Sequence, residues 1–332
     1  MKKEENNKLQ EAIDSIKRKY GDGAVMKSGE IADKIESIST NCYAIDNLLG
    51  CGGIPRGRIT EIFGAESSGK STLCLYLAAQ VQKAGGVCVY IDAENAYDQK
   101  YANTIGVDTG KLLVSQPASL EESFDLIREF AESNAVDLII IDSVSALVPK
   151  SEIEGEEMLK DTMAVQARLL SKGLRILSGP ISKSKTVVIF INQLRANIGV
   201  MYGQKEITTG GKALKYYASV RLNIGKGDKI MGAKDEQIGN TMNITAVKNK
   251  VGFPFKKGSI DLYYGRGVDL VVDALDFGSD VGVIKLVGNT YSFDGEKIGV
   301  GRTNARNYLV KNLDVYKKIK SKIDEEINST KK

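Results

Sequence analysis

The segment GAESSGKST at residues 64–72 constrains the fold of this chain more than any other. Two glycines bracket four residues and precede a lysine and a hydroxyl, which is the G-x-x-x-x-G-K-[ST] pattern of a phosphate-binding loop. A β-branched and aromatic run comes before it at 59–63, and apolar residues at helical spacing follow it until Gly85 and Gly86. An ordinary glycine-rich connection is the alternative. The strand and helix on either side favour a nucleoside triphosphate site instead.

The pattern assigns roles within this loop. Small residues let backbone N–H groups converge on phosphate oxygens at the start of a helix. Lys70 is placed to reach the β- and γ-phosphates, and the Ser71 hydroxyl is placed to ligate Mg²⁺. The predicted nucleotide contacts are Gly64, Ala65, Glu66, Ser67, Ser68, Gly69, Lys70, Ser71 and Thr72.

Apolar runs and helical patterns alternate through the middle of the chain. Continuous apolar runs lie at 59–63, 87–91, 112–116, 138–142 and 187–191, with helical stretches at 119–133 and 160–182. This succession predicts an α/β fold with a twisted, mostly parallel sheet between helices. After residue 218, short alternating runs predict antiparallel strands added to one edge. From 269, a hairpin at YSFDGEKIG and a lysine-rich helix after 303 predict a small α+β unit.

Polar residues close several of the predicted strands. Asp92 and Glu94 follow one strand, Asp142 ends another and Gln193 follows a third. Ligands in such sheets lie at the carboxyl ends of the strands. Asp142 is placed to organise Mg²⁺ hydration, a carboxylate at 92 or 94 to orient a water, and Gln193 to sense the γ-phosphate. The alternative for each is a polar residue that merely ends a strand or caps a helix.

Composition excludes several classes of function. The formal net charge is only +4, so any nucleic-acid site is local. The chain has no histidine, which excludes Ser–His and Cys–His chemistry. Four cysteines form no C-x-x-C, and no apolar run has transmembrane length. The N-terminal segment lacks the apolar region of a signal peptide, so we expect a cytoplasmic protein with reduced thiols and no membrane partner.

Six segments occur together in an order that resembles the RecA family of bacterial recombinases. They are GAESSGKST, IDAEN, IIIDSVSALVPKSEIEGE, FINQLR, IGVMYGQKEITTGGKALKYYASVRL and VKNKVGFPFK, within a resemblance that covers residues 5 to 325. The resemblance implies a RecA-like P-loop core at 36–268. It is preceded by an N-terminal helix and oligomerisation segment at 1–35 and followed by a C-terminal α+β domain at 269–332.

The resemblance also implies roles for individual residues. Glu94 would polarise the attacking water, Asp142 would be the Walker B aspartate and Gln193 the γ-phosphate sensor. Lys248 and Lys250 would reach the nucleotide from a neighbouring subunit. Adenine contacts would come from Asp98, Tyr101 and Tyr264. Two DNA-facing loops fall at 155–164 and 194–210, and the implied DNA contacts are Arg168, Ser171, Arg175, Arg195, Gly210 and Gly211.

Residues 195–211 support a binding loop independently. The segment holds four glycines without strong periodicity and is longer than an ordinary connection. Ile198, Val200 and Met201 are poor choices for a solvated loop but suit insertion between bases. A mobile surface loop is the alternative.

Three functions remain open on the sequence alone. The first is a DNA-dependent ATPase that polymerises on single-stranded DNA, pairs it with duplex DNA and exchanges strands, using ATP and Mg²⁺. A co-protease role toward a LexA-like repressor in the SOS response goes with it. The second is a ring-forming helicase-type ATPase. The third is a nucleotide-switched DNA-binding scaffold, against which Glu94 and Asp142 argue.

Overall fold

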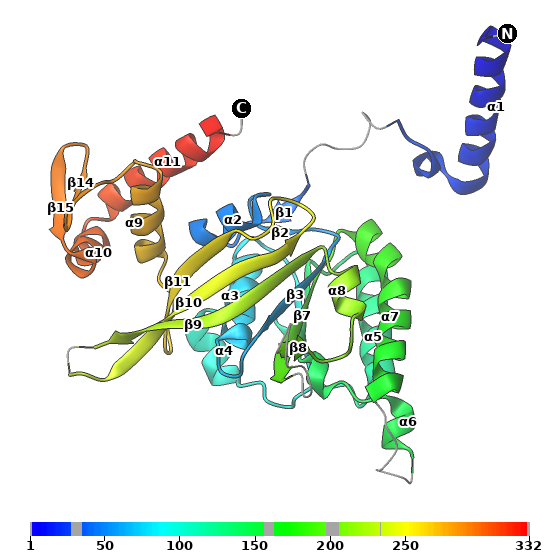
Figure 1. Cartoon of the computed structure of the whole chain (residues 1–332), viewed down its shortest axis with the longest axis horizontal. Helices are drawn as coiled ribbons and strands as arrows, with labels where there is room; N and C mark the ends of the chain where they lie inside the picture. Colours follow the sequence, from blue (N-terminus) through cyan, green and yellow to red (C-terminus); the bar gives the residue numbers. More distant parts are fainter. Residues whose placement is uncertain (1, 28–34, 156–162, 197–205, 233, 331–332) are drawn as a thin grey trace. The chain divides into compact units, whose positions relative to one another are not determined.

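The computed structural model describes residues 2–27, 35–155, 163–196, 206–232 and 234–330 (Figure 1). They form two compact units that meet in sequence between Glu36 and Ser37. Among these residues, no helix is both long enough and apolar enough to cross a membrane.

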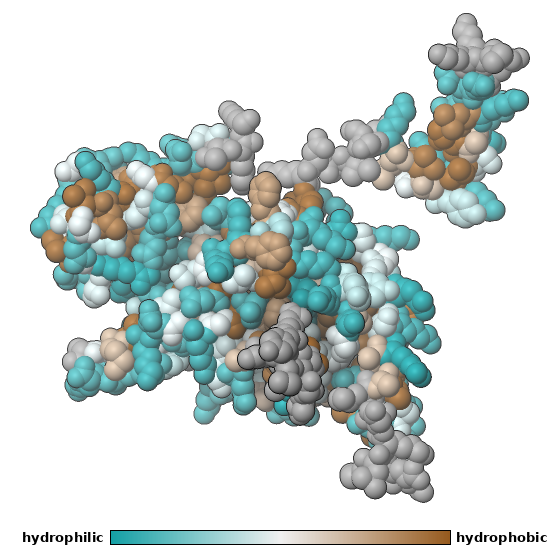
Figure 2. Space-filling view, in the orientation of Figure 1, coloured by the Kyte–Doolittle hydropathy of each residue, from teal (hydrophilic) through white to brown (hydrophobic). Residues whose placement is uncertain are grey.

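The first unit is a single long helix with a short turn. Helix α1 spans Lys2–Tyr20, and a 3₁₀ turn η1 spans Asp22–Ala24 after Gly21, whose φ is 92°. Leu9, Ile16 and Tyr20 are exposed, and Figure 2 shows hydrophobic groups along this helix. These residues form an apolar stripe on α1, and the described residues of its own unit leave this stripe uncovered.

A mixed sheet organises the second unit. Its strand order is β12-β11-β10-β9-β3-β7-β6-β4-β5, with β8 paired to β7. The parallel strands are β3 (Ile59–Gly64), β4 (Cys88–Asp92), β5 (Leu113–Ser115), β6 (Leu138–Asp142), β7 (Val187–Ala196) and β9 (Val220–Met231). The antiparallel strands are β8 (Glu206–Thr208), β10 (Gln237–Asn249), β11 (Lys257–Tyr263) and β12 (Gly267–Val268).

Helices cover both faces of this sheet, which confirms the predicted fold class (Figure 1). On one face α3 (Lys70–Lys83) and α4 (Gln99–Ile105) pack against residues such as Ile62 and Ile189. On the other face α5 (Leu120–Glu132), α7 (Met163–Ser184) and α8 (Ala213–Tyr217) pack against residues such as Val188 and Phe190. Because both faces are covered, the central strands are apolar on both sides.

Short elements complete this core. Strands β1 (Ser37–Ile38) and β2 (Ile54–Pro55) form a separate ribbon around α2 (Tyr43–Leu49). The 3₁₀ turn η3 (Val144–Ala146) and α6 (Lys150–Ile153) follow β6.

Three details of the sheet differ from the sequence predictions. The first strand after residue 218, β9, pairs with β3 in parallel, and only its successors are antiparallel. Strand β5 is an edge strand whose Leu113 and Val114 are exposed, so it is not covered on both faces. Strand β7 continues beyond Gln193 to Ala196 and pairs with β8, so the ends of the predicted loop at 194–210 are strands.

The C-terminal lobe, residues 269–330, has its own core. It contains α9 (Leu270–Asp280), β13 (Lys285–Val287), β14 (Thr290–Phe293), β15 (Glu296–Val300), α10 (Arg302–Lys311) and α11 (Leu313–Thr330). Strands β14 and β15 form the predicted hairpin at YSFDGEKIG. The predicted lysine-rich helix is in fact two helices, which Asn312 separates. The α+β character of this segment is as predicted.

Candidate nucleotide and DNA site

The glycine-rich segment joins β3 to α3 in a turn that needs its glycines. Gly69 has a φ of 91°, and a Cβ atom there would lie 2.6 Å from the Met242 methyl group. A Cβ at Gly64 would lie 2.1 Å from the Ile224 carbonyl oxygen. The loop can therefore pass close to β9 and β10 only with glycine at these two positions.

Lys70 begins α3 and points back into the loop. Its side chain is buried, and its Nζ donates hydrogen bonds to the carbonyls of Gly64 (3.3 Å) and Ala65 (2.8 Å). Burial lowers the pKa of Lys70, while the negative charges of Asp142 and Glu94 oppose that shift. A buried cation enclosed by loop backbone is well placed for a polyanionic ligand.

The loop fits a nucleoside triphosphate. Backbone N–H groups at the start of the 14-residue α3 face the loop, and the helix dipole adds positive potential there. Among the described residues, Ser68 Oγ is one of few buried side-chain oxygens without a hydrogen-bond partner, so it has a free bonding capacity in the loop. The Thr72 hydroxyl and the Tyr101 hydroxyl share a 2.8 Å hydrogen bond. Tyr101, one of the predicted adenine contacts, therefore lies next to the loop.

Asp142 lies at the carboxyl end of β6, next to the first turn of α3. It accepts hydrogen bonds from Tyr90 OH (2.6 Å) and from the Ser71 side chain. Burial raises the pKa of Asp142, and these two hydrogen bonds oppose the shift. A buried carboxylate beside a serine hydroxyl is a donor set of the all-oxygen kind that Mg²⁺ prefers. Ser71 and Asp142 therefore fit the predicted metal role.

Glu94, which follows β4, meets Gln193 of β7, although β6 lies between these two strands in the sheet. Gln193 Nε2 donates to Glu94 Oε1 at 3.1 Å, and Ser143 Oγ donates to the same carboxylate. The backbone N–H groups of Ala93 and Glu94 bond to the Asp142 carbonyl, which ties the end of β4 to the end of β6. The side chain of Glu94 is exposed, so water can reach it.

The strand-end pattern left Asp92 and Glu94 both open for orienting a water, and the family resemblance pointed to Glu94; the structure gives Asp92 other partners. Asp92 is buried and accepts hydrogen bonds from the N–H groups of Ala96 and Tyr97 and from Gln116 Nε2. These contacts shape the turn after β4, so Asp92 has a structural role.

The predicted adenine contacts lie on two different elements. Asp98 caps α4 by accepting from the Tyr101 backbone N–H at 3.0 Å. Tyr264 follows β11, is half exposed, and its hydroxyl accepts from Gln237 Nε2 at 2.8 Å. Since Leu262 of β11 packs within 3.0 Å of the Cβ position of Gly69, this end of β11 lies beside the phosphate-binding loop.

Lys248 and Lys250 lie at the other end of the sheet from this loop. Gly64 is level with Ile224 of β9, and the Lys250 N–H bonds to the carbonyl of Ser219, five residues before Ile224. At 3.3 Å per residue, this offset is about 17 Å. Lys248 Nζ instead donates to the Lys215 and Tyr216 carbonyls at the end of α8. The two lysines are thus out of reach of the loop in their own chain.

The predicted DNA contacts converge around α7. Arg168, Ser171 and Arg175 lie at a three- and four-residue spacing, and all three are exposed, opposite the buried Leu170 and Leu174.

The end of the second loop packs against the same helix. Cβ atoms at Gly210 and Gly211 would lie 2.9 Å from Leu170 Cδ2 and 3.1 Å from Ala167 Cβ, and both glycines have positive φ. Arg195 is exposed on β7. Ile198, like Val200 and Met201, lies outside the described residues.

Sequence reasoning missed a buried polar group in the middle of the sheet. Glu61, Asn192 and Arg221 come from three adjacent strands and bond to one another. A charged residue inside the apolar runs ITEIF and ASVRLNI is the signal that could have indicated them.

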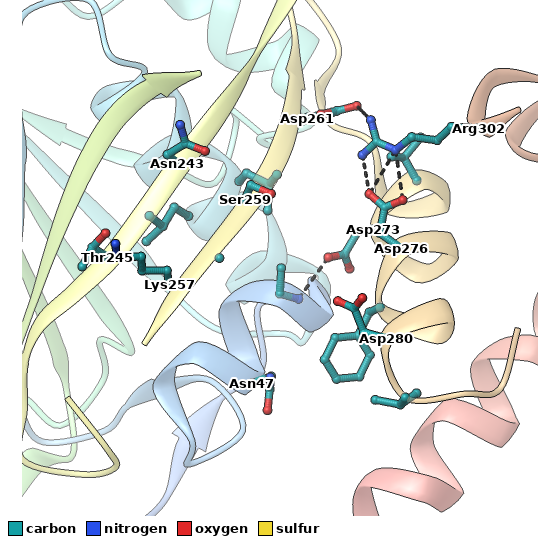
Figure 3. Close-up of a pocket in the computed structure, with 17 residues that line it drawn as sticks. Asn47, Asn243, Thr245, Lys257, Ser259, Asp261, Asp273, Asp276, Asp280 and Arg302 are labelled. Carbon is teal, nitrogen blue, oxygen red and sulfur yellow. Dashed lines mark hydrogen bonds and ion pairs between the residues drawn. The ribbon is translucent and has the colours of Figure 1, made fainter. Parts of the chain in front are cut away.

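A cleft of about 840 Å³ lies away from the phosphate-binding loop, between β10, β11 and α9. Figure 3 shows Arg302 between Asp261 and Asp276, with Asp273 and Asp280 on the same side. Arg302 pairs with both Asp261 and Asp276. The remaining carboxylates disfavour a polyanion, so this cleft is not a second triphosphate site.

Comparison with known proteins identifies the family of this chain. The model for the RecA N-terminal domain matches residues 7–269, and the model for the RecA C-terminal domain matches residues 272–328. Curated proteins named Protein RecA are 46% identical to the chain. That of Lactobacillus acidophilus aligns over 97% of this chain and 88% of its own length, and that of Chlorobium chlorochromatii over 95% and 89%. The protein of Caulobacter vibrioides aligns over 98% and 94%. The chain therefore belongs to the RecA family of DNA recombination and repair proteins.

Proposed function

We propose that the chain is a DNA-dependent ATPase that hydrolyses ATP to ADP and phosphate with Mg²⁺ while it acts in recombination and repair. It polymerises as a helical filament on single-stranded DNA, pairs that strand with homologous duplex and exchanges strands. One observation carries the proposal. The phosphate-binding loop, Asp142, Glu94 and Gln193 meet at the carboxyl ends of four parallel strands, and Glu94 is open to water.

The chain's own residues divide the work of hydrolysis. Loop N–H groups and Lys70 bind and orient the phosphates, which is most of what phosphoryl transfer needs from a protein. Glu94 accepts a proton from a water and holds it in line, and Gln193 and Ser143 orient the Glu94 carboxylate. Mg²⁺ held by Ser71 and Asp142 would supply charge neutralisation on the phosphates.

Other partners follow from surfaces on the same chain. The exposed apolar stripe of α1 suits contact with a second copy, and Lys248 and Lys250 suit a nucleotide held by a neighbour. The basic face of α7 and the glycines at 210 and 211 suit phosphates of DNA. A LexA-like repressor as a further partner and a cytoplasmic location belong to the same proposal.

A first test addresses catalysis. Glu94→Gln keeps the shape of the site but removes the proton acceptor, so we expect ATP hydrolysis on single-stranded DNA to fall by about 100-fold or more. ATP binding should stay within about threefold, whereas Lys70→Ala should weaken binding by at least about tenfold. The exposed Glu132→Gln on α5 is the matched control. Near-normal turnover in Glu94→Gln would remove Glu94 from the mechanism.

Electron microscopy with single-stranded DNA and a slowly hydrolysed ATP analogue tests assembly. Helical filaments are the expected outcome. Closed rings would favour the helicase-type alternative, and the absence of both would favour a nucleotide-switched scaffold.

A further inference from the structure

A buried charged group crosses the three central strands of the sheet. Glu61 of β3 is fully buried, as is Asn192 of β7, and Arg221 of β9 is 8% exposed. The register places Glu61 opposite Arg221, and both side chains lie on the sheet face that carries α7 and α8. Burying a carboxylate and a guanidinium is costly unless every polar atom is paired, so their placement requires an explanation.

Both carboxylate oxygens of Glu61 and both polar atoms of the Asn192 side chain are hydrogen-bonded. Glu61 Oε1 accepts from Asn192 Nδ2 at 2.9 Å, and Glu61 Oε2 accepts from Arg221 Nε. The guanidinium of Arg221 also lies 4.6 Å from the ring centroid of Phe63, two residues along β3. Glu61 therefore fixes the positions of Asn192 and Arg221 at the same time.

Asn192 links Glu61 to the end of the second DNA loop and to the nucleotide site. Its Nδ2 donates to the Thr209 carbonyl at 3.0 Å, directly before Gly210. Its Oδ1 accepts from the Gln193 backbone N–H at 2.9 Å, and Gln193 contacts Glu94. The side chain that contacts the proposed catalytic carboxylate and the side chain that holds the end of the loop thus belong to consecutive residues.

Arg221 lies on the other side of Glu61, next to β10. It is level with Lys248 on β10, and Lys248 holds the end of α8, the helix that follows the loop. Burial and then the neighbouring Lys250 and Arg221 lower the pKa of Lys248, whereas Glu61 raises it. Glu61 therefore contacts the side chain that holds Thr209 and offsets the positive charge around Lys248, which holds the other end of the segment at residues 215 and 216.

We infer that Glu61 is a positioning residue that, through Asn192, couples the nucleotide site at Gln193 to the end of the second DNA loop at Thr209. The inference rests on the proposed function. A purely structural buried pair would hold the fold without affecting how DNA and ATP influence each other, and this difference makes the two roles separable.

Asn192→Ala is the first test, because it cuts the connection while leaving the Glu61–Arg221 pair in place. We expect ATP binding to stay within about threefold, since the loop contacts are untouched. The stimulation of ATP hydrolysis by single-stranded DNA should fall at least about tenfold, and the preference of DNA binding for ATP over ADP should fall by a similar factor. Glu61→Gln should shift both ratios in the same direction.

A matched control and a double variant complete the test. Thr60→Val alters a neighbouring buried side chain of β3 that has no hydrogen-bond partner among the described residues, and it should leave both ratios unchanged. Glu61→Gln combined with Asn192→Ala should be no worse than Asn192→Ala alone, because both act on one connection.

The outcomes separate this inference from the proposed function. Folded variants that bind ATP and keep normal DNA stimulation would reduce the group to a structural role and overturn the inference. Additive losses in the double variant would overturn it as well. A wild-type chain whose hydrolysis ignores DNA would instead contradict the proposed function itself.

Discussion

Burial controls the chemistry of individual side chains in this protein. Lys70 and Asp142 are both buried beside the phosphate-binding loop. Burial lowers the pKa of Lys70 and raises the pKa of Asp142, which favours the neutral form of each. Their mutual attraction, together with Glu94, opposes the shift of Lys70. The site therefore holds opposite charges in a poorly solvated place, where a triphosphate with its metal ion can interact strongly.

Burial also affects the thiol groups of the cysteines. Burial raises the pKa of Cys88 to about 12 and raises the pKa of Cys42 and Cys74 well above the usual value. Because only the thiolate reacts, iodoacetamide at pH 8 should label the half-buried Cys51 at least about tenfold faster than Cys88. Raising the pH to 9 should speed labelling of Cys88 about tenfold while the chain stays folded. Peptide mass spectrometry measures both, with urea-unfolded protein as the control. Equal labelling in the folded protein would contradict the prediction.

At the scale of residues, the sequence predicted what one short segment can specify. The segment GAESSGKST predicts the phosphate-binding loop and the roles of Lys70 and Ser71, because all of these residues lie in one strand–turn–helix unit. It could not give the partners of Glu61, because Asn192 and Arg221 are 131 and 160 residues away. The strand-end pattern likewise did not separate Asp92 from Glu94, because the partners of Asp92 appear only in the turn that it stabilises.

At the scale of elements, strand pairing determined features that the local sequence pattern did not indicate. QLRA at 193–196 has no strict alternation, so the sequence indicated a loop, yet Leu194, Arg195 and Ala196 pair with Thr208, Ile207 and Glu206. Strand β9 is a second example. Its alternating pattern predicts a strand, but it does not show whether the neighbouring strand runs parallel or antiparallel. Helices such as α5 were predicted well, because Ser119 caps its start and the apolar spacing is local.

The C-terminal lobe is fastened to the core by a helix cap from another element. Asp273 of α9 accepts from the backbone N–H groups of Tyr43 (2.6 Å) and Ala44 (3.0 Å) at the start of α2. The N-cap residue of α2, Cys42, makes no side-chain cap bond. The Tyr43 ring also stacks on Phe277 at 5.4 Å. The lobe thus satisfies backbone donors that α2 leaves unbonded.

Replacing Asp273 tests this cap. Burial raises the pKa of Asp273, so folding disfavours its charge and what stabilises the contact is the acceptor oxygen. Asp273→Ala should lower the free energy of unfolding by about 1–3 kcal/mol. Asp273→Asn, which keeps one of the two acceptor oxygens, should lower it by a smaller amount. Urea unfolding at pH 7 measures both. The exposed Asp280→Ala on the same helix should change little. An equal loss for the alanine and asparagine variants would show that the acceptor is not what matters.

At the scale of the whole molecule, the predicted nucleotide residues fall into two groups that one chain does not bring together. The sheet register separates Lys250 from the phosphate-binding loop by about 17 Å along the strands. If both lysines act on a nucleotide, the nucleotide belongs to another copy. A repeating head-to-tail contact of that kind produces a polymer, in which every interior subunit gives its loop to one neighbour and its lysines to the other.

Mixing two inactive variants tests this division. Lys250→Ala keeps an intact loop and Glu94, and Glu94→Gln keeps an intact Lys250, so random mixing at equal amounts should form about one quarter fully wild-type sites. We expect ATP hydrolysis on single-stranded DNA to recover to about that fraction. Lys70→Ala mixed with Glu94→Gln is the matched control, because both changes lie in the same half of the site and no mixed contact restores it. If the first mixture stays as inactive as this control while filaments still form, each nucleotide site is complete within one chain.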